Sequence, residues 1–260
     1  MKDNRAHPSV SLKSRASQAA TGLTLAALIF GSWLSLHFFS MFVFDLSLAS
    51  LPLAIAIAAV QCWLSVGLFI VSHDAMHGSL VPGSKRINSA IGATLLFLYA
   101  GFSWTKMRGA HFDHHRLAGK KGDPDFDENH PAAFWPWYAT FLRRYFGPGS
   151  IVFVFSVVII YGLVLDVPLG KIVLLYGAPA IASSIQLFYF GTFRPHHHVD
   201  GKGETFADRH NARSENFGTL ASLASCFHFG YHHEHHCRPD TPWWALPKVR
   251  REVLNKGAAA

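Results

Sequence analysis

Apolar segments long enough to cross a membrane alternate with polar segments along this chain. Four stretches contain no Asp, Glu, Lys or Arg: 16–44, 46–73, 145–165 and 172–193. A membrane-spanning helix needs about 20 apolar residues, within a range of roughly 17–25. The pattern therefore predicts an all-α integral membrane protein, one domain over residues 1–260, with four transmembrane helices at about 19–44, 51–71, 151–167 and 172–193.

Histidines gather near the ends of these apolar segments in repeated spacings. An H-x-x-x-H pair ends the second span, and the spacing H-x-x-H-H occurs twice. In a helix, positions i, i+3 and i+4 share one face, so each cluster directs its imidazoles to one spot. Because a zinc site usually has four ligands, eight imidazoles predict a metal centre with more than one ion. The clusters are His73 and His77; His111, His114 and His115; and His232, His235 and His236.

The apolar segment from Ile87 to Thr105 lies between the first two clusters. A single crossing here would put the second cluster on the opposite side of the membrane from the first. If the clusters converge on one centre, this segment is an in-plane helix or a re-entrant hairpin. Gly92, Gly101 and the aromatic residues that follow fit a segment lying at the membrane boundary.

Positive charge is concentrated between the second and third spans. The net charge of the chain is +7, and Lys and Arg concentrate in cytoplasmic segments beside membrane spans. We therefore place the histidine clusters and the basic tail 1–17 on the cytoplasmic side of the cell inner (plasma) membrane. The charge is attributed to topology rather than to nucleic-acid binding. The three cysteines include no C-x-x-C pair, so no sulfur-bound zinc site is indicated.

The type of ligand limits the choice of metal. Imidazole suits zinc, copper, iron and nickel, and the H-E-x-x-H motif of zinc proteases is absent from the sequence. Iron can activate dioxygen whereas zinc is redox-silent, so oxidation is favoured over zinc-dependent hydrolysis. A metal transporter or a metal-binding membrane protein without enzyme activity is a further alternative. Transport predicts polar residues near the bilayer midplane, and the apolar stretches hold almost none.

The order of the histidine clusters resembles that of a known superfamily. H-x-x-x-H followed by two H-x-x-H-H clusters among four spans is similar to the membrane fatty-acid desaturases and hydroxylases, over about residues 20–250. Within that superfamily, three segments resemble the bacterial β-carotene 4-ketolases, and the last of them is long and specific. These segments are His73-Asp-Ala-Met-His-Gly78, Asp208-Arg-His-Asn-Ala-Arg213 and Cys226-Phe-His-Phe-Gly-Tyr-His-His-Glu-His-His236.

This resemblance implies an oxidoreductase with two iron ions that uses O2 as co-substrate. The expected reaction introduces a keto group at C4 of a β-ionone ring, converting β-carotene to echinenone and canthaxanthin, and zeaxanthin to astaxanthin. Two hydroxylations at one carbon give a geminal diol, which loses water. The carotenoid is expected from the bilayer, and the electrons from a ferredoxin-like external donor. A carotenoid ring hydroxylase or an acyl desaturase would use the same iron chemistry, and the spacing does not distinguish them.

The resemblance also implies a ninth ligand near the end of the fourth span. That position falls on His196, but residues 194–198 read Arg-Pro-His-His-His, where the family more often has Leu-Pro-His followed by another residue type. His197 and His198 are therefore alternatives to His196. His228 is a reserve ligand, because it precedes His232 by four residues and would share its face in a continuous helix.

Further residues are candidates for orienting the ligands or lining the substrate site. A metal-bound imidazole usually donates its other N–H to a carboxylate or a carbonyl. Candidates for this role are Asp113, Asp123, Asp125, His210, His228 and His233, and the alternative for the acidic residues is a solvated loop. An apolar substrate also needs a long aromatic-lined channel. Its candidate lining, with ordinary membrane packing as the alternative, is Leu96, Phe97, Tyr99, Phe188 and Phe190.

Overall fold

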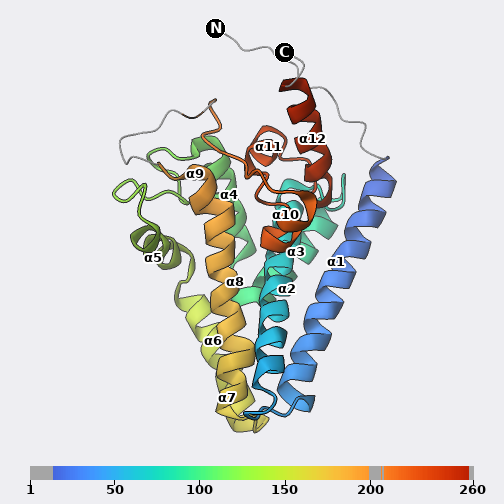
Figure 1. Ribbon diagram of the computed structural model, residues 1–260, viewed down its shortest axis with the longest axis vertical. Helices are drawn as coiled ribbons and strands as arrows, with labels where there is room; N and C mark the ends of the chain where they lie inside the picture. The colour runs from blue at the N-terminus through green and yellow to red at the C-terminus, as the bar shows by residue number, and fades with distance from the viewer. Residues whose placement is uncertain (1–13, 199–205, 207, 258–260) are drawn as a thin grey trace.

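The computed structural model describes residues 14–198, 206 and 208–257, and their secondary structure is helical, without β-strands. Most of the predicted tail 1–17 lies outside these residues. Short π-helical segments extend the helices at Phe39–Val43, Ile160–Val164, Ile172–Gly177 and Tyr189–Phe193, and a 3-10 turn covers Trp243–Ala245. The α-helices, labelled as in Figure 1, are α1 (Arg15–Phe38), α2 (Leu51–His77), α3 (Lys85–Ala100), α4 (Trp104–Leu117), α5 (Phe134–Tyr145), α6 (Pro148–Ile159), α7 (Leu169–Lys171), α8 (Ala178–Phe188), α9 (Arg194–His196), α10 (Thr219–Cys226), α11 (His232–Cys237) and α12 (Leu246–Gly257).

Three helical segments are long and apolar enough to cross a membrane: Arg15–Val43, Leu51–His77 and Leu169–His196. α2 packs against both α1 and α8, and the three segments form the long bundle in Figure 1. They correspond to the first, second and fourth predicted spans. Helix α2 ends at Gly78, whose φ of 75° suits the left-handed conformation that glycine adopts without strain.

Large apolar side chains cover much of the outer surface of this bundle. Leu28 on α1, Ile55 on α2, Phe155 on α6 and Ile181 on α8 are each more than half exposed. Soluble monomers rarely expose apolar patches of this extent. The surface is therefore suited to lipid, and the protein is a membrane protein.

Two pairs of helices are sharply bent instead of straight. α3 and α4 meet at 100°, and α5 meets the segment Pro148–Val164 at 87°. The predicted third span, 151–167, is found only as the second arm of such a pair. Counting each bent pair as one span gives five candidates, so the candidates number three to five within the described residues.

The bend between α3 and α4 corresponds to the segment predicted as in-plane or re-entrant. Gly101 has a φ of 67° and ends α3. The Trp104 ring at the start of α4 packs against Gly92, where an added Cβ would lie 2.2 Å from it. The bend thus depends on two positions without a side chain, and α4 lies at the same end of the bundle as α9 and α11 in Figure 1.

The C-terminal segment packs against the end of α2. The Trp243 backbone N–H donates a hydrogen bond of 3.0 Å to the buried carboxylate of Asp74. The Phe227 ring stacks on Trp63, with centroids 4.4 Å apart. Because Asp74 directly follows His73, these contacts bring the third histidine cluster next to the first.

Candidate metal centre

Five of the predicted ligands form one compact group, which we call the first histidine group. It contains His73 and His77 from α2, His111 and His115 from α4, and His235 from α11, with one ring nitrogen of each within 4.8 Å of the others. The Nε2 atoms of His77 and His111 approach to 2.6 Å, and those of His235 and His115 to 3.0 Å. Three helices from distant parts of the sequence therefore point ring nitrogens at one place.

The other four predicted ligands form the second histidine group. His114 of α4, His196 of α9, and His232 and His236 of α11 offer ring nitrogens within the same 4.8 Å limit. The Nε2 of His232 lies 3.0 Å from the Nε2 atoms of both His196 and His236. The three histidines of each H-x-x-H-H cluster are thus divided between the two groups. The expectation that all imidazoles of one cluster point to one spot did not predict this division.

The electrostatics of these groups suit metal ions. Burial, followed by the neighbouring imidazoles, holds the pKa values of His232, His235 and His236 well below the ordinary value, so the rings are neutral. Neutral imidazole is the form that binds metals. Among the described residues, both ring nitrogens of the buried His73 lack a hydrogen-bond partner, and buried polar atoms without partners are rare. Metal ligation would satisfy one of these two nitrogens.

Outer hydrogen bonds fix the rings of the second group. The His114 Nδ1–H donates to the Asp123 carboxylate at 3.0 Å, and His196 Nδ1–H donates to the Asn211 carbonyl at 2.7 Å. These bonds leave Nε2 of each ring with its lone pair towards the group. Burial opposes ionisation of Asp123, but His114 and two backbone N–H groups hold the pKa of this carboxyl below its usual value. The contact predicted for Asp123 is present.

A second acidic residue lies on the same side of His114. The Asp125 Oδ2 is 3.8 Å from Nδ1 of His114, and the Tyr145 hydroxyl donates a hydrogen bond to Asp125. Burial raises the pKa of Asp125 above its usual value. Asp113 was wrongly included in this set: it is exposed and pairs with Arg116 at 2.8 Å, because it occupies the outer face of α4.

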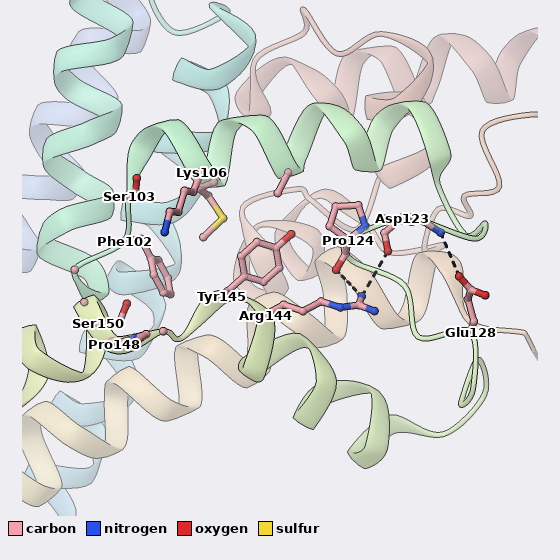
Figure 2. Close-up of a pocket in the computed structure, with 16 residues that line it drawn as sticks. Phe102, Ser103, Lys106, Asp123, Pro124, Glu128, Arg144, Tyr145, Pro148 and Ser150 are labelled. Atoms are coloured by element: carbon pink, nitrogen blue, oxygen red, sulfur yellow. Dashed lines mark hydrogen bonds between the residues drawn. The ribbon is translucent and has the colours of Figure 1, made fainter.

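The loop that carries the acidic residues is held by Arg144 and Glu128. Figure 2 shows the Arg144 guanidinium donating to loop carbonyls, with a distance of 2.7 Å to that of Pro124. Glu128 accepts a hydrogen bond from the Gly122 N–H at 3.2 Å. These contacts border a pocket of about 490 Å³ and give the loop a fixed shape. The loop is therefore ordered by specific bonds at the position of Asp123.

Three further predicted histidines lie outside both groups. His228 was expected to share the face of His232, but its φ of 63° lies in a break between α10 and α11, and its ring stacks on Trp243. His233 bonds to Asp208 at 2.8 Å, and the His210 ring faces it. The continuous helix on which the choice of His228 as reserve ligand depended is absent, and His228 lies outside both histidine groups.

Of the three neighbouring histidines at 196–198, all described by the structure, His196 is the one that lies in a histidine group. His196 belongs to the second group, whereas the His197 ring stacks on Phe193 and His198 contacts the Phe126 ring. α9 ends at His196, so the next two residues leave the helix and turn away from the group.

A cavity of about 520 Å³, which we call the histidine cavity, adjoins both groups and is lined by His73, His111, His114 and His232. Lining residues recur along Leu169–His196 at helical spacing: 176, 177, 180, 181, 184, 187, 191 and 192. At 1.5 Å per residue, the cavity follows this helix for about 24 Å. Most of its remaining lining is aromatic or aliphatic.

Of the five predicted channel residues, one lines the histidine cavity and four do not. Tyr99 lines the histidine cavity. Leu96 and Phe188 are fully buried in neighbouring clusters, Phe97 is 55% exposed on the outer surface, and Phe190 packs against the core. Which face of a helix meets the cavity depends on its rotation in the bundle, and apolar sequence alone does not encode that rotation.

Several residues that support the site were not predicted from the sequence. Asn211 holds His196, and Tyr145 holds Asp125. Glu234 is buried and accepts hydrogen bonds from Ser214 and from Arg250 of α12, the latter at 2.8 Å. Glu234 is a charged residue inside a run of histidines, and a buried charge needs a partner. Its position in the sequence could therefore have indicated a supporting contact.

Comparison with known proteins agrees with this geometry. The family model for fatty acid desaturase matches residues 46–159 and 149–259. The chain is 48% identical to a β-carotene ketolase of Paracoccus sp. (strain PC1), over 88% of this chain and 91% of that protein. It is 32% identical to β-carotene 4-ketolase 3 of Haematococcus lacustris, over 89% and 79% respectively. A zeaxanthin 4-ketolase of Chlamydomonas reinhardtii is 32% identical over 92% of this chain and 54% of that protein. The chain therefore belongs to the fatty acid desaturase family and, within it, to the β-carotene ketolases.

Proposed function

We propose that this protein is a di-iron, O2-dependent carotenoid ketolase that introduces a keto group at C4 of β-ionone rings. The observation that carries the proposal is the histidine cavity. It starts at nine clustered histidines and follows a membrane-spanning helix for about 24 Å. A long, narrow, mainly apolar cavity of this kind suits a rod-like polyene with its ring next to the metal groups.

The two histidine groups fit two iron ions. The first group offers five ring nitrogens and the second four, and imidazole is a common ligand of iron. Bound iron would supply the reduction of O2. Asp123 and the Asn211 carbonyl would keep the rings of His114 and His196 in the ligating tautomer.

The proposed reaction balances over two rounds. Each round uses one O2, two protons and two electrons from the donor, converts one C4–H bond to C4–OH, and releases one water. The second round acts on the same carbon and gives a geminal diol. Loss of water from the diol leaves the ketone, so the ring gains one oxygen and loses two hydrogens.

The membrane arrangement belongs to the same proposal. Four crossings, by α1, α2, the segment Pro148–Val164 and the segment Leu169–His196, would put the histidines on the cytoplasmic side of the inner membrane, with α3 not crossing. The supporting signs are the bend between α3 and α4 and the exposed basic residues around the histidine end. A ferredoxin-like electron donor, which is acidic in this proposal, would dock on that basic face.

Other functions fit the structure less well. A metal transporter needs a polar path at the bilayer midplane, whereas the histidine cavity is mainly apolar along its helix. An acyl desaturase or a carotenoid hydroxylase would use a similar metal centre. The likeness to ketolases over most of the chain favours ketone formation.

Pigment analysis tests the proposal. A bacterial host that accumulates β-carotene would express this chain, and its pigments would be separated and weighed by mass spectrometry. Products that gain one oxygen and lose two hydrogens per ring are expected. Products that only gain oxygen would indicate a hydroxylase, and unchanged β-carotene in cells that supply an electron donor and whose purified enzyme carries iron would indicate an acyl-chain substrate instead.

A further inference from the structure

Thr192 places a hydroxyl without a partner in the histidine cavity. Its side chain lines the cavity and is 6% exposed. Within the described part of the chain, this hydroxyl makes no hydrogen bond. In contrast, the Tyr99 hydroxyl pairs with Ser183 at 3.0 Å, and that of Tyr138 donates to Ser184 at 3.1 Å. Because Thr192 lines the cavity, a polar group of a ligand inside the cavity could serve as the hydrogen-bond partner of its hydroxyl.

The position of Thr192 places it at the reacting end of the cavity. It precedes His196 by four residues in one continuous helical segment, about 6 Å along the axis, and it lines the same cavity as His114 and His232. The neighbouring Gly191 has no side chain and leaves room beside Phe229, which also lines the cavity. Among the described residues the Tyr176 hydroxyl likewise has no hydrogen-bond partner, but Tyr176 lies 16 residues earlier, about 24 Å from Thr192 along the helix axis.

The unoxidised hydrocarbon ring has no group that can form a hydrogen bond with the Thr192 hydroxyl. After one round of oxidation, however, the ring carries a hydroxyl at C4, the carbon nearest the metal groups. We propose that Thr192 binds this C4 hydroxyl and retains the alcohol for the second oxidation. The inference rests on the proposed function and deepens it, because it names the residue that favours ketone over released alcohol.

In an apolar site, a polar group is more stable when it has a hydrogen-bond partner. A hydroxyl buried without a hydrogen bond is destabilised, so without Thr192 the alcohol would leave the cavity more readily. With Thr192, the alcohol stays with its remaining C4–H bond near the metal groups. The threonine acts by holding the intermediate and takes no part in proton or electron transfer.

The test compares product ratios in a β-carotene-accumulating host. Thr192→Val keeps the branched shape and removes the hydroxyl, whereas Thr192→Ser keeps the hydroxyl. The ratio of 4-hydroxylated to 4-keto pigment is expected to rise about five- to tenfold in Thr192→Val, the factor that corresponds to one neutral hydrogen bond. It should return towards the wild-type value in Thr192→Ser. The variants are compared at equal enzyme amounts and equal conversion of β-carotene, because the share of the alcohol in a two-step oxidation also depends on how far the reaction has run.

Thr94→Val is the matched control, since Thr94 is exposed on the outer face of α3. Its product ratio should equal that of the wild type. If Thr192→Val also shows the wild-type ratio, the inference is wrong, while a ketone-producing wild type would leave the proposed function intact. If the wild type makes no ketone, the proposed function itself fails.

A binding measurement provides a readout that is independent of turnover. Purified metal-free protein in detergent would be titrated with 4-hydroxy-β-carotene and with β-carotene. Thr192→Val should weaken binding of the alcohol about five- to tenfold and leave that of the hydrocarbon unchanged. Equal losses for both ligands would assign Thr192 a packing role and overturn the inference.

Discussion

At the scale of single residues, Asp123 orients the metal-facing ring of His114. Its carboxylate accepts the Nδ1–H of His114 and is itself fixed by the backbone N–H groups of Gly119 and Asp125. Asp123→Asn would weaken this bond and loosen the ring. Loss of such an outer partner typically costs 10–100-fold in metal affinity or activity. We expect a loss of that size, measured as iron retained after dialysis and as ketone formed.

Asp113→Asn is the control for this prediction. Asp113 is exposed and its ion pair with Arg116 is a surface pair, which contributes little to stability. Iron content and ketone formation should therefore stay near the wild-type values. Full iron retention and activity in Asp123→Asn would show that Asp123 does not support the site.

At the scale of residues, the spacing of histidines along a helix predicts only part of the site. The i, i+3, i+4 rule predicted that the three histidines of each H-x-x-H-H cluster point to one spot, but those of α4 and of α11 are divided between the two groups. It did not predict that His114 would leave His111 and His115 for the second group, because that depends on where α9 and α11 lie. His228 failed because Phe227 and His228 adopt positive φ values and interrupt the helix.

At the scale of elements, the contact between Gly92 and Trp104 holds the bend between α3 and α4. This bend positions the three histidines of α4. An added Cβ at Gly92 would lie 2.2 Å from the Trp104 ring. Gly92→Ala should therefore displace the start of α4 and destabilise the protein by about 1–3 kcal/mol. The expected result is a lower midpoint of thermal unfolding in detergent, together with reduced ketone formation.

Gly109→Ala is the comparison within α4 itself. Nothing lies within 4 Å of a Cβ at this position, and alanine favours helix, so stability should be unchanged or higher by about 0.4–1 kcal/mol. A Gly92→Ala variant as stable and active as Gly109→Ala would contradict the importance of this contact.

Helices whose position depends mainly on apolar length could be located from the sequence. The charge-free stretches located α1, α2 and the segment Leu169–His196, because apolar length decides whether a helix can cross a membrane. The parity of the histidine clusters also indicated that 87–105 is not a straight span. The bend between α5 and α6 was not predicted. It occurs at a turn at Phe146 and Gly147, and no motif that recurs elsewhere in the chain marks this turn.

At the scale of the whole molecule, the metal groups join parts of the chain that are far apart in sequence. The proposed ligands come from α2, α4, α9 and α11, so bound iron would link helices between residues 73 and 236. A ligand that binds only the folded state stabilises it by about 2.7 kcal/mol at 100 times its Kd. For a chain of this size, that corresponds to a rise in Tm of about 5–10 °C.

We therefore expect iron-loaded protein to unfold at a Tm about 5–10 °C above that of chelated protein, measured in detergent with the metal content determined in parallel. His235→Ala removes a ligand from the first group and should reduce the shift between the two states. His228→Ala should keep the full shift, because the His228 ring stacks on Trp243 outside both groups. Each variant serves as its own reference, so a general loss of stability does not affect the comparison. An equal Tm with and without bound iron would show that metal binding and folding are not linked through these histidines.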